Sequence, residues 1–327
     1  MQYYPTLIAA LSLWTGALAL TDAQADGQRR VAVTFDDLPV VAVSKNDAST
    51  RRMITTGLLQ SLTAREIPAI GFVNEGKFTH NGEIDDNQVD LLRLWLLAGL
   101  ALGNHSFSHT DLHRAALSDF QEDVLRGELV TRGLLAERGL QPEFFRHPYL
   151  HTGRDLETKL GFETFLAQHD YRVAPVSIDN SEWIFARAYV LALEAGDTSL
   201  AEQIGIEYVQ YMLDIFDFYE SQSKILFERN IAQVLLVHAN ELNSVWFGVL
   251  ADRLAGKGYE FISLAEALRD PAYESPDTYT GPAGISWLHR WAITKNVDPK
   301  TMQGEPETPG HILKLTELPQ HLNPTSE

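Results

Sequence analysis

The fold of this chain is decided at Val31-Ala32-Val33-Thr34-Phe35-Asp36-Asp37, a short apolar run that ends in two adjacent carboxylates. A continuous apolar run of this length predicts a strand buried on both faces. Comparable strands are predicted at 69–73, 144–145, 164–167, 173–176 and 234–237, with helical patterns at 50–64, 87–98, 118–138 and 244–255, and a final strand and helix within 260–268. Strands that alternate with helices predict βα units and a mainly parallel sheet, open or closed into a barrel.

Two regions depart from this alternation and define the domain organisation. Residues 184–230 are almost wholly helical and form a helical insertion within a catalytic domain that we predict at 26–270. The aromatic residues of the insertion recur at helical spacing, which fits packing on the flank of the barrel and also fits a lid that contacts substrate. Residues 271–327 are rich in Pro, Gly, Asp and Glu, so we expect an irregular C-terminal extension, in which Ile285-Ser286-Trp287-Leu288 docks on an apolar patch.

The N-terminus has the pattern of a signal peptide. The run from Leu7 to Leu20 is mostly apolar, too short to span a membrane but long enough for the apolar part of such a peptide. Small-residue cleavage sites follow, the second at Ala23-Gln24-Ala25. Because no Lys or Arg precedes the run, a buried N-terminal helix is the alternative. We expect a signal peptide at 1–25, no stable membrane span, and export to a periplasm or to the outside.

The composition restricts the partners of this chain. It has 327 residues, is 45% hydrophobic and carries a formal net charge of −18, values that suit a globular protein with a sizeable core. Nucleic acids and anionic membrane surfaces require clustered Lys and Arg, so we expect neither as a partner. Because the chain has no Cys, it has no disulfide framework, no thiolate metal ligand and no Cys nucleophile.

Two pairs of residues are suited to metal chemistry. His105 and His109 are four positions apart, which places them on one face of a helical turn, where both can bind one ion. The H-E-x-x-H motif of many zinc enzymes would have Glu at position 106, but this chain has Ser, so a general base must come from elsewhere. Asp36 and Asp37 end an apolar strand, where adjacent carboxylates are costly unless one of them is compensated, for example by a metal. A polar junction between strand and loop explains this second pair equally well.

Further polar segments also follow predicted strands. They are Phe145-Arg146-His147-Pro148-Tyr149, Asp179-Asn180-Ser181-Glu182-Trp183 and Leu236-Val237-His238. An Arg in such a position can hold a carboxylate by two hydrogen bonds, whereas a single His is also explained as a hydrogen-bonded core residue. In parallel barrels the active site is built at the carboxyl ends of the strands, so we expect these segments to meet there.

The ordered set T-F-D-D, N-H-S-x-x-H, R-x-P-Y, D-x-x-E-W and L-x-H resembles the NodB-homology polysaccharide deacetylases, carbohydrate esterase family four. The resemblance covers about 30–269, apart from the helical insertion. It implies an α/β fold of the irregular (β/α) barrel type, shorter than eight full units. It also implies a metal-dependent hydrolase that removes acetyl groups from an N- or O-acetylated polysaccharide.

The resemblance assigns roles to the first motifs. It implies that Asp37, His105 and His109 bind one divalent metal ion, most often zinc in this family, with cobalt and nickel as alternatives. It implies Asp36 as the general base and Arg146 as the residue that orients it.

The remaining motifs are assigned in the same way. Tyr149 is implied to offer its backbone N–H to the oxyanion. His238 is implied as the general acid, oriented by Asp179. Leu236 and Trp183 are implied to shape the pocket for the acetyl methyl group.

The chain departs from the family pattern at several positions. Leu150 stands where Gly is usual, Glu182 replaces the commoner Asp, and His147 is a candidate for substrate contact. The polymer stays open between chitin-like chains, peptidoglycan, a glucosamine polymer and acetylated xylan. The alternatives are an amidohydrolase of the same fold acting on a small cyclic imide or ureide, and an inactive glycan-binding module. The expected export argues against the first, and the intact motif residues argue against the second.

Overall fold

A computed structural model describes residues 28–318, and the predicted signal peptide at 1–25 lies outside the described residues. The central element is a sheet of seven strands in the order β7-β6-β5-β2-β1-β8, with β9 paired to β1. The strands are β1 (Arg29–Leu38), β2 (Ile70–Val73), β5 (Ala101–Asn104), β6 (Phe144–Phe145), β7 (Arg172–Val173), β8 (Gln233–His238) and β9 (Tyr259–Ile262). Every pairing in this sheet is parallel. The predicted α/β class is therefore confirmed.

The sheet curls into an irregular barrel, because the chain that leaves β7 pairs with the far edge of the sheet. Ile178 forms a parallel bridge with Leu235 of β8. The N–H of Leu236 donates to the Ile178 carbonyl at 3.3 Å, and the N–H of Ser177 donates to the Val234 carbonyl at 3.1 Å. These contacts join the β7 side of the sheet to β8, so the ring contains fewer than eight full units, as expected.

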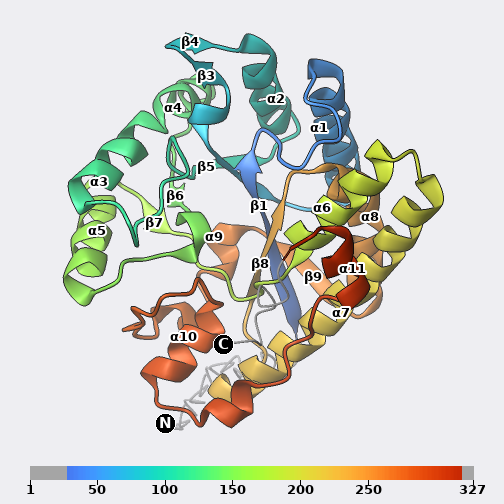
Figure 1. Ribbon diagram of the computed structural model, residues 1–327. Helices are drawn as coiled ribbons and strands as arrows, with labels where there is room; N and C mark the ends of the chain where they lie inside the picture. The colour runs from blue at the N-terminus through green and yellow to red at the C-terminus, as the bar shows by residue number, and fades with distance from the viewer. Residues whose placement is uncertain (1–27, 319–327) are drawn as a thin grey trace, which may run out of the picture.

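Helices cover the outside of the barrel (Figure 1). They are α1 (Ala48–Thr63), α2 (Asp86–Leu97), α3 (Leu117–Arg126), α4 (Leu129–Ala136), α5 (Leu156–Gln168), α8 (Glu241–Gly256) and α9 (Leu264–Ala267). A small hairpin of β3 (Thr79–His80) and β4 (Glu83–Ile84) follows the short helix η1 (Glu75–Lys77), and η2 (Pro148–Leu150) precedes α5. Buried side chains of β1 such as Val33 and Phe35 join α1 residues such as Leu58 in one core cluster.

Two expected elements differ in the structure. The helix predicted over 118–138 is divided into α3 and α4 at Gly127. A Cβ at Gly127 would lie 2.5 Å from the N atom of Phe107, so glycine lets the helix pair approach the loop that carries the histidines. The strand predicted at 164–167 is wrong, because these residues belong to α5. Short apolar runs fit both periods, and the length of the surrounding pattern favours the helix.

The insertion folds as two helices, α6 (Glu182–Glu194) and α7 (Thr198–Phe227). The side chains of Tyr208, Met212 and Phe216 in α7 are 0% exposed. The hydroxyl of Tyr208 donates to Oδ1 of Asn243 in α8 at 2.7 Å. Of the alternatives left open by the sequence, this burial favours packing on the barrel flank over a substrate lid.

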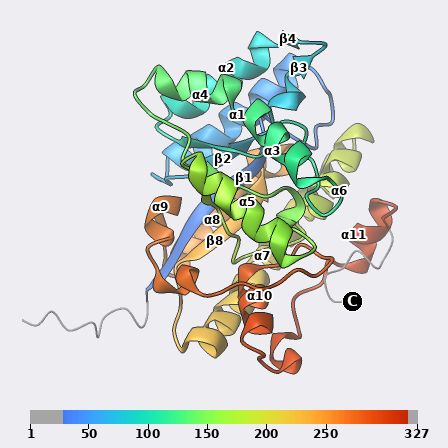
Figure 2. The ribbon, with the colours of Figure 1, turned by 90° about the vertical axis from the view of Figure 1, so that its left-hand side faces the viewer.

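The C-terminal extension is more ordered than expected. It contains η3 (Pro271–Glu274), α10 (Trp287–Thr294), η4 (Pro299–Met302) and α11 (Gly310–Leu315). The expectation of an irregular segment is therefore partly wrong, because Leu288 and Trp291 of α10 are buried and stabilise this helix by packing on the domain. The predicted docking at Trp287 is observed, with 7% of that residue exposed. Figure 2 shows the chain between α9 and α10 passing beside α5.

Within residues 28–318, no helix combines the length and apolar character needed to cross a membrane.

Candidate active site

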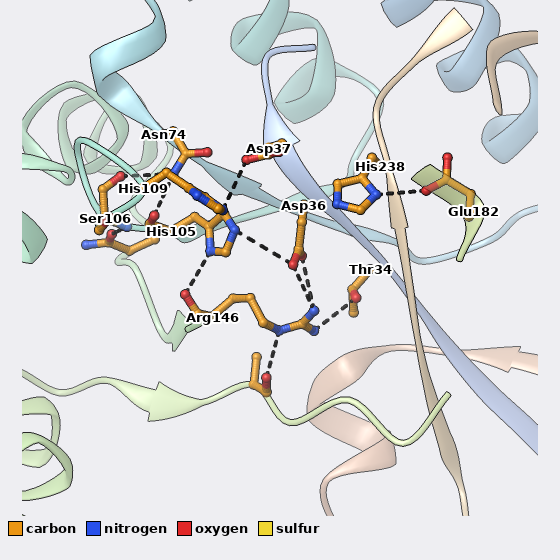
Figure 3. Close-up of polar contacts among 12 residues, drawn as sticks. Thr34, Asp36, Asp37, Asn74, His105, Ser106, His109, Arg146, Glu182 and His238 are labelled. Carbon is orange, nitrogen blue, oxygen red and sulfur yellow. Dashed lines mark hydrogen bonds and ion pairs between the residues drawn. The ribbon is translucent and has the colours of Figure 1, made fainter. Parts of the chain in front are cut away.

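The polar segments that follow the strands meet at one edge of the barrel (Figure 3). Asp36 on β1 is the register partner of His238 on β8. Asn104, which ends β5, is the register partner of Phe145, which ends β6. Since His105 follows Asn104 and Arg146 follows Phe145, parallel pairing brings the catalytic candidates to the same level of the sheet.

The candidate metal centre consists of Asp37, His105 and His109, whose ligand atoms all lie within 4.8 Å of one another. The ring of His105 makes a hydrogen bond from Nδ1 to the Arg146 carbonyl at 2.8 Å, which leaves Nε2 available as a ligand. Nε2 of His109 lies 3.7 Å from Oδ1 of Asp37. Two imidazoles and one carboxylate form a donor set typical of zinc and related divalent ions. The three residues therefore fit the predicted metal.

The local backbone around the histidines differs from the helical turn that the sequence predicted. Residues 105–109 are not helical, and both Ser106 (φ 63°) and His109 (φ 54°) lie in the left-handed region. The side chain of Asn74 donates to the His105 carbonyl at 2.5 Å, and the side chain of Asn104 accepts from the N–H of Ser106 at 2.7 Å. Side-chain amides, not helical hydrogen bonds, hold this loop, and the same two histidines still converge.

The protonation states of the three ligands suit metal binding. Burial lowers the pKa of His105 and of His109 to about 4, so both rings are neutral at pH 7. Burial would raise the pKa of Asp37, but Lys77, His238 and the nearby histidines outweigh it and lower that pKa below its ordinary value. Neutral imidazoles and an ionised carboxylate are the forms that bind metals, so no proton has to be displaced at neutral pH.

Lys77 is a site residue that the sequence did not reveal. Its Nζ lies 3.3 Å from Oδ1 of Asp37 and donates to the Asp37 carbonyl at 2.7 Å. Asp37 has a φ of 67°, so this bond also stabilises a backbone conformation that a non-glycine residue rarely adopts. Lys77 comes from the short helix after β2, and no motif pattern distinguishes it from a surface lysine.

Asp36 lies between a metal-ligand candidate and a buried arginine. Both of its oxygens accept from one guanidinium nitrogen of Arg146, at 3.1 and 3.2 Å. Arg146 is fixed in turn by bonds to the Ala174 carbonyl at 2.8 Å and to the Thr34 hydroxyl at 3.0 Å. Nε2 of His105 lies 3.8 Å from Oδ2 of Asp36. Burial raises the pKa of Asp36 despite the charge of Arg146, which increases its affinity for a proton.

His238 pairs with Glu182, and the predicted pairing with Asp179 is wrong. Oε2 of Glu182 lies 2.7 Å from Nδ1 of His238. Asn240 and Asn243 donate to the other oxygen of Glu182 at 2.5 and 2.8 Å, so the carboxylate is held from both sides. Burial alone would lower the pKa of His238, but the hydrogen bond and charge of Glu182, with the nearby aspartates, raise it to about 9. The ring is therefore a charged proton donor at neutral pH.

Asp179 lies near the site but in a separate acidic group. It accepts from the N–H of Asn180 at 2.9 Å, and burial raises its pKa to about 6. Glu305 in the C-terminal extension accepts from the hydroxyl of Tyr219 at 3.1 Å, and burial together with the charge of Asp179 raises its pKa to about 8. Sequence reasoning missed Glu305, since nothing near it in the chain points to the barrel.

The residues predicted to contact substrate separate into two groups. Tyr149 and Trp183 form the exposed group, with 56% and 42% of each residue exposed. The ring of Tyr149 lies edge-on to the ring of His109, with 4.5 Å between the ring centroids. Leu236 is 8% exposed and belongs to the wall of β8. The prediction for His147 is wrong: it is 2% exposed, and its ring packs edge-on against Phe145. The chain turns at Pro148, so His147 faces the interior while Tyr149 faces out.

Asp111, His113 and His151 form a second histidine cluster, with ligand atoms also within 4.8 Å of one another. The two rings stack at 3.8 Å with an interplanar angle of 6°. Nitrogen lone pairs lie in the ring plane, so parallel stacked rings cannot both direct a lone pair at one ion. Oδ1 of Asp111 already accepts from the His151 ring at 2.7 Å and from the His113 N–H at 2.8 Å. This cluster therefore fits a hydrogen-bonded brace and does not fit a metal centre.

The sequence is similar to known deacetylases. The profile of the family described as polysaccharide deacetylase matches residues 23–165. A peptidoglycan-N-acetylglucosamine deacetylase from Bacillus cereus is 23% identical over 170 residues, covering 52% of this chain and 52% of the relative. A chitooligosaccharide deacetylase from Bradyrhizobium is 28% identical over 123 residues, covering 38% of this chain and 47% of the relative. The chain thus spans about half the length of these relatives.

Among solved structures, a family 4 carbohydrate esterase from Streptomyces lividans in complex with acetate matches with a TM-score of 0.45 and 20% identity, covering 73% of this chain and 95% of that chain. The family profile includes the segments of Asp36, His105 and Tyr149 but ends before Glu182 and His238. The latter two residues are therefore connected to the site by the geometry alone.

Proposed function

The chain belongs to the polysaccharide deacetylase family, and from this we propose that it is a metal-dependent hydrolase that removes acetyl groups from an N- or O-acetylated polysaccharide. The observation that carries the proposal is the position of Asp36. It lies beside the metal-ligand candidates on one side and is the register partner of the proton donor His238 on the other. Acyl transfer to water requires a base, an acid and a metal ion close together. The candidates for all three roles lie together at the carboxyl ends of the strands.

The metal would be held by Asp37, His105 and His109. When bound there, a divalent ion supplies Lewis acidity and lowers the pKa of a coordinated water from about 15.7 toward about 7. Zinc suits two imidazoles and a carboxylate, and cobalt and nickel are the alternatives.

Asp36 acts as the general base. Its two oxygens are fixed by Arg146, which is itself buried and held by bonds to Thr34 and Ala174. The carboxylate takes a proton from the attacking water, and its raised pKa makes it a better acceptor than an exposed aspartate. Arg146 orients Asp36, and its charge opposes the effect of burial on the pKa of that carboxyl.

His238 acts as the general acid. Glu182 keeps its ring protonated and fixes its orientation through Nδ1, which leaves Nε2 to donate to the leaving group. An amine leaves an N-acetyl group only after protonation, so the raised pKa of His238 matters most for that class of substrate.

The acetyl group is positioned by residues at the open side. The backbone N–H of Tyr149 is the candidate donor to the oxyanion, and losing one such donor typically costs about 10²–10³ in kcat. Leu236 and the exposed ring of Trp183 are the candidates for contact with the acetyl methyl group and the sugar.

The polymer is proposed to lie outside the cytoplasm. The apolar run from Leu7 to Leu20 followed by Ala23-Gln24-Ala25 supports export. Export favours a polymeric substrate over a small cyclic imide or ureide. Mapping the N-terminus of the mature protein tests this: we expect cleavage after Ala25, and a chain that keeps its first residues would favour the small-molecule alternative.

The function is tested by acetate release. The purified chain, stripped of metal by a chelator, is supplied with zinc, cobalt or nickel and assayed on chitin-like chains, peptidoglycan, a glucosamine polymer and acetylated xylan. We expect acetate from at least one polymer, in a metal-dependent manner. Hydrolysis of a small cyclic imide without acetate from any polymer would replace the proposal, and polymer binding without hydrolysis would support a glycan-binding module.

A further inference from the structure

The loop that carries the candidate oxyanion donor has an unusual backbone. Tyr149 and Leu150 in η2 both lie in the left-handed region, with φ of 57° and 55°. Side chains other than glycine rarely adopt this conformation, and it persists only where surrounding contacts impose it. Within the loop itself, the N–H of Leu150 donates to the His147 carbonyl at 3.1 Å and that of His151 donates to the Pro148 carbonyl at 3.1 Å. These two bonds use the carbonyls of His147 and Pro148. Any contact that fixes the carbonyls of Tyr149 and Leu150 therefore has to come from outside the loop.

Arg290 of the C-terminal extension supplies that contact. It is 1% exposed, and its guanidinium donates to the Leu150 carbonyl at 3.3 Å and to the Thr152 hydroxyl at 2.5 Å. Its Nε donates to Oδ2 of Asp277 at 2.9 Å. Asp277 also pairs with Lys159 of α5 at 2.6 Å, so Arg290 is held in a buried ion-pair network. A fixed guanidinium with several donors is suited to holding backbone carbonyls in place.

Gly284 approaches the same loop from the other end of the extension segment. A Cβ at Gly284 would lie 1.8 Å from the carbonyl oxygen of Tyr149 and 2.9 Å from its carbonyl carbon. The obstructing atoms are backbone, which cannot rotate away, so any side chain at position 284 must displace the loop. Glycine is required here for a close approach of two backbones.

The extension segment is itself tied to the barrel. The N–H of Trp287 donates to the Val176 carbonyl at 2.7 Å, and the hydroxyl of Ser286 donates to the Ser177 carbonyl at 2.6 Å. Both acceptors lie in the chain that closes the barrel against β8. Residues of the loop and of the extension, among them His147, Thr152 and Trp287, line a shared cavity of about 640 Å³. The extension, which is itself held against the barrel, therefore provides fixed points for the loop.

We propose that the segment Gly284–Arg290 is a positioning element of the catalytic site. Gly284 packs directly against the Tyr149 carbonyl and Arg290 donates to the Leu150 carbonyl, so together they restrict the backbone of this turn and, through it, the direction of the Tyr149 N–H. The effect on catalysis rests on the proposed function, whereas the ordering of the loop by the extension does not. Displacements of about 1 Å at a reacting group cost on the order of 10² in rate.

The ordering is tested by hydrogen–deuterium exchange of the peptide that contains 147–152. Arg290→Gln and Gly284→Ala are compared with the wild-type chain. The matched controls are Arg229→Gln, which breaks another part-buried arginine pair with Asp270, and Gly310→Ala, where a Cβ meets no atom within 4 Å. We expect at least tenfold faster exchange in 147–152 for the two test variants and no change there for the controls. Equal exchange in test and control variants would overturn the proposal, whatever the enzyme's activity.

The catalytic consequence is tested by steady-state kinetics and metal content on the same variants. We expect kcat to fall by about 10²-fold in Gly284→Ala, with KM within about twofold and metal content unchanged. Arg290→Lys should recover part of the kcat lost in Arg290→Gln, since an ammonium can hold one of the two acceptors. Faster hydrogen–deuterium exchange in 147–152 together with an unchanged kcat would overturn the positioning role. A wild-type chain without acetate release would instead contradict the proposed function and leave the exchange result standing.

Discussion

Oε2 of Glu182 lies 2.7 Å from Nδ1 of His238, so the first residue of α6 holds the ring at the end of β8. This contact links the helical insertion to the proposed general acid, because α6 begins at Glu182 and α7 packs against α6. The N–H of Ser181, which precedes Glu182, donates to the hydroxyl of Tyr211 in α7 at 2.9 Å. The helical insertion thus helps to hold Glu182, and through it His238, the proposed general acid, in position.

Replacing Glu182 with Gln should lower the pKa of His238. Glu182 raises that pKa to about 9 against the effect of burial, so its removal decreases the protonated fraction of the ring above neutral pH. The alkaline limb of the kcat–pH profile should move to lower pH by about one unit or more, and kcat at pH 8 should fall by at least about twofold, since a pKa near 8 leaves about half of the rings protonated at that pH. The profile of Asp179→Asn is the comparison: a shift in that variant and none in Glu182→Gln would restore the pairing first predicted.

Sequence patterns were sufficient to predict which residues converge at the candidate site, because parallel pairing aligns strand ends. Asp36, Arg146 and His238 each follow a predicted strand, whereas β5, which leads to His105, was not predicted; the register places all four residues together. The partner of His238 was not predictable in this way. Asp179 and Glu182 are three positions apart, and the choice between them depends on where α6 begins, a boundary that no single residue type marks.

Contacts between distant parts of the chain could not be predicted from the sequence either. Lys77, Glu305 and Arg290 act on the site or its loop from segments with no motif of their own. Their roles depend on how η1 and the C-terminal extension pack, which is a property of the folded core and not of local spacing. Gly284 looks like any turn glycine in the sequence, although its neighbour in space is the Tyr149 carbonyl.

From the candidate metal centre we predict that each chain binds one divalent ion tightly. His105→Ala should lose metal and activity together, because two remaining ligands bind an ion weakly. Metal content is measured after dialysis, with Asp111→Asn as the control in the stacked histidine cluster, which should keep a full equivalent. A double His105→Ala, His109→Ala chain that retains stoichiometric metal would show that the ion binds elsewhere.

Replacing Glu305 with Gln should stabilise the fold at alkaline pH. The pKa of Glu305 is raised from 4.5 to about 8 in the folded chain, so the folded state binds its proton more tightly than the unfolded state does. The stability that comes from this proton is complete below about pH 4.5 and is lost as the pH rises to about 8. The Tm of Glu305→Gln relative to wild type should therefore increase between pH 5 and pH 9, by about 2–4 °C for each kcal/mol. The exposed Glu194→Gln is the control, and a parallel change in both variants would refute the assignment.

Asp36 and Asp37 are neighbours but should respond differently to the same substitution. Asp36 faces Arg146, whereas Asp37, whose backbone is left-handed, faces Lys77 and His109. Asp36→Asn should keep its metal and lose about 10²- to 10⁴-fold in kcat, the usual worth of a general base. Asp37→Asn should bind metal more weakly and regain part of its activity in excess metal, since the two histidines remain. Calorimetric titration of zinc into both variants, with acetate release measured in parallel, separates the roles. Loss of metal from Asp36→Asn and its retention by Asp37→Asn would mean that the roles are exchanged, and full activity in both variants would mean that the reaction occurs at another site.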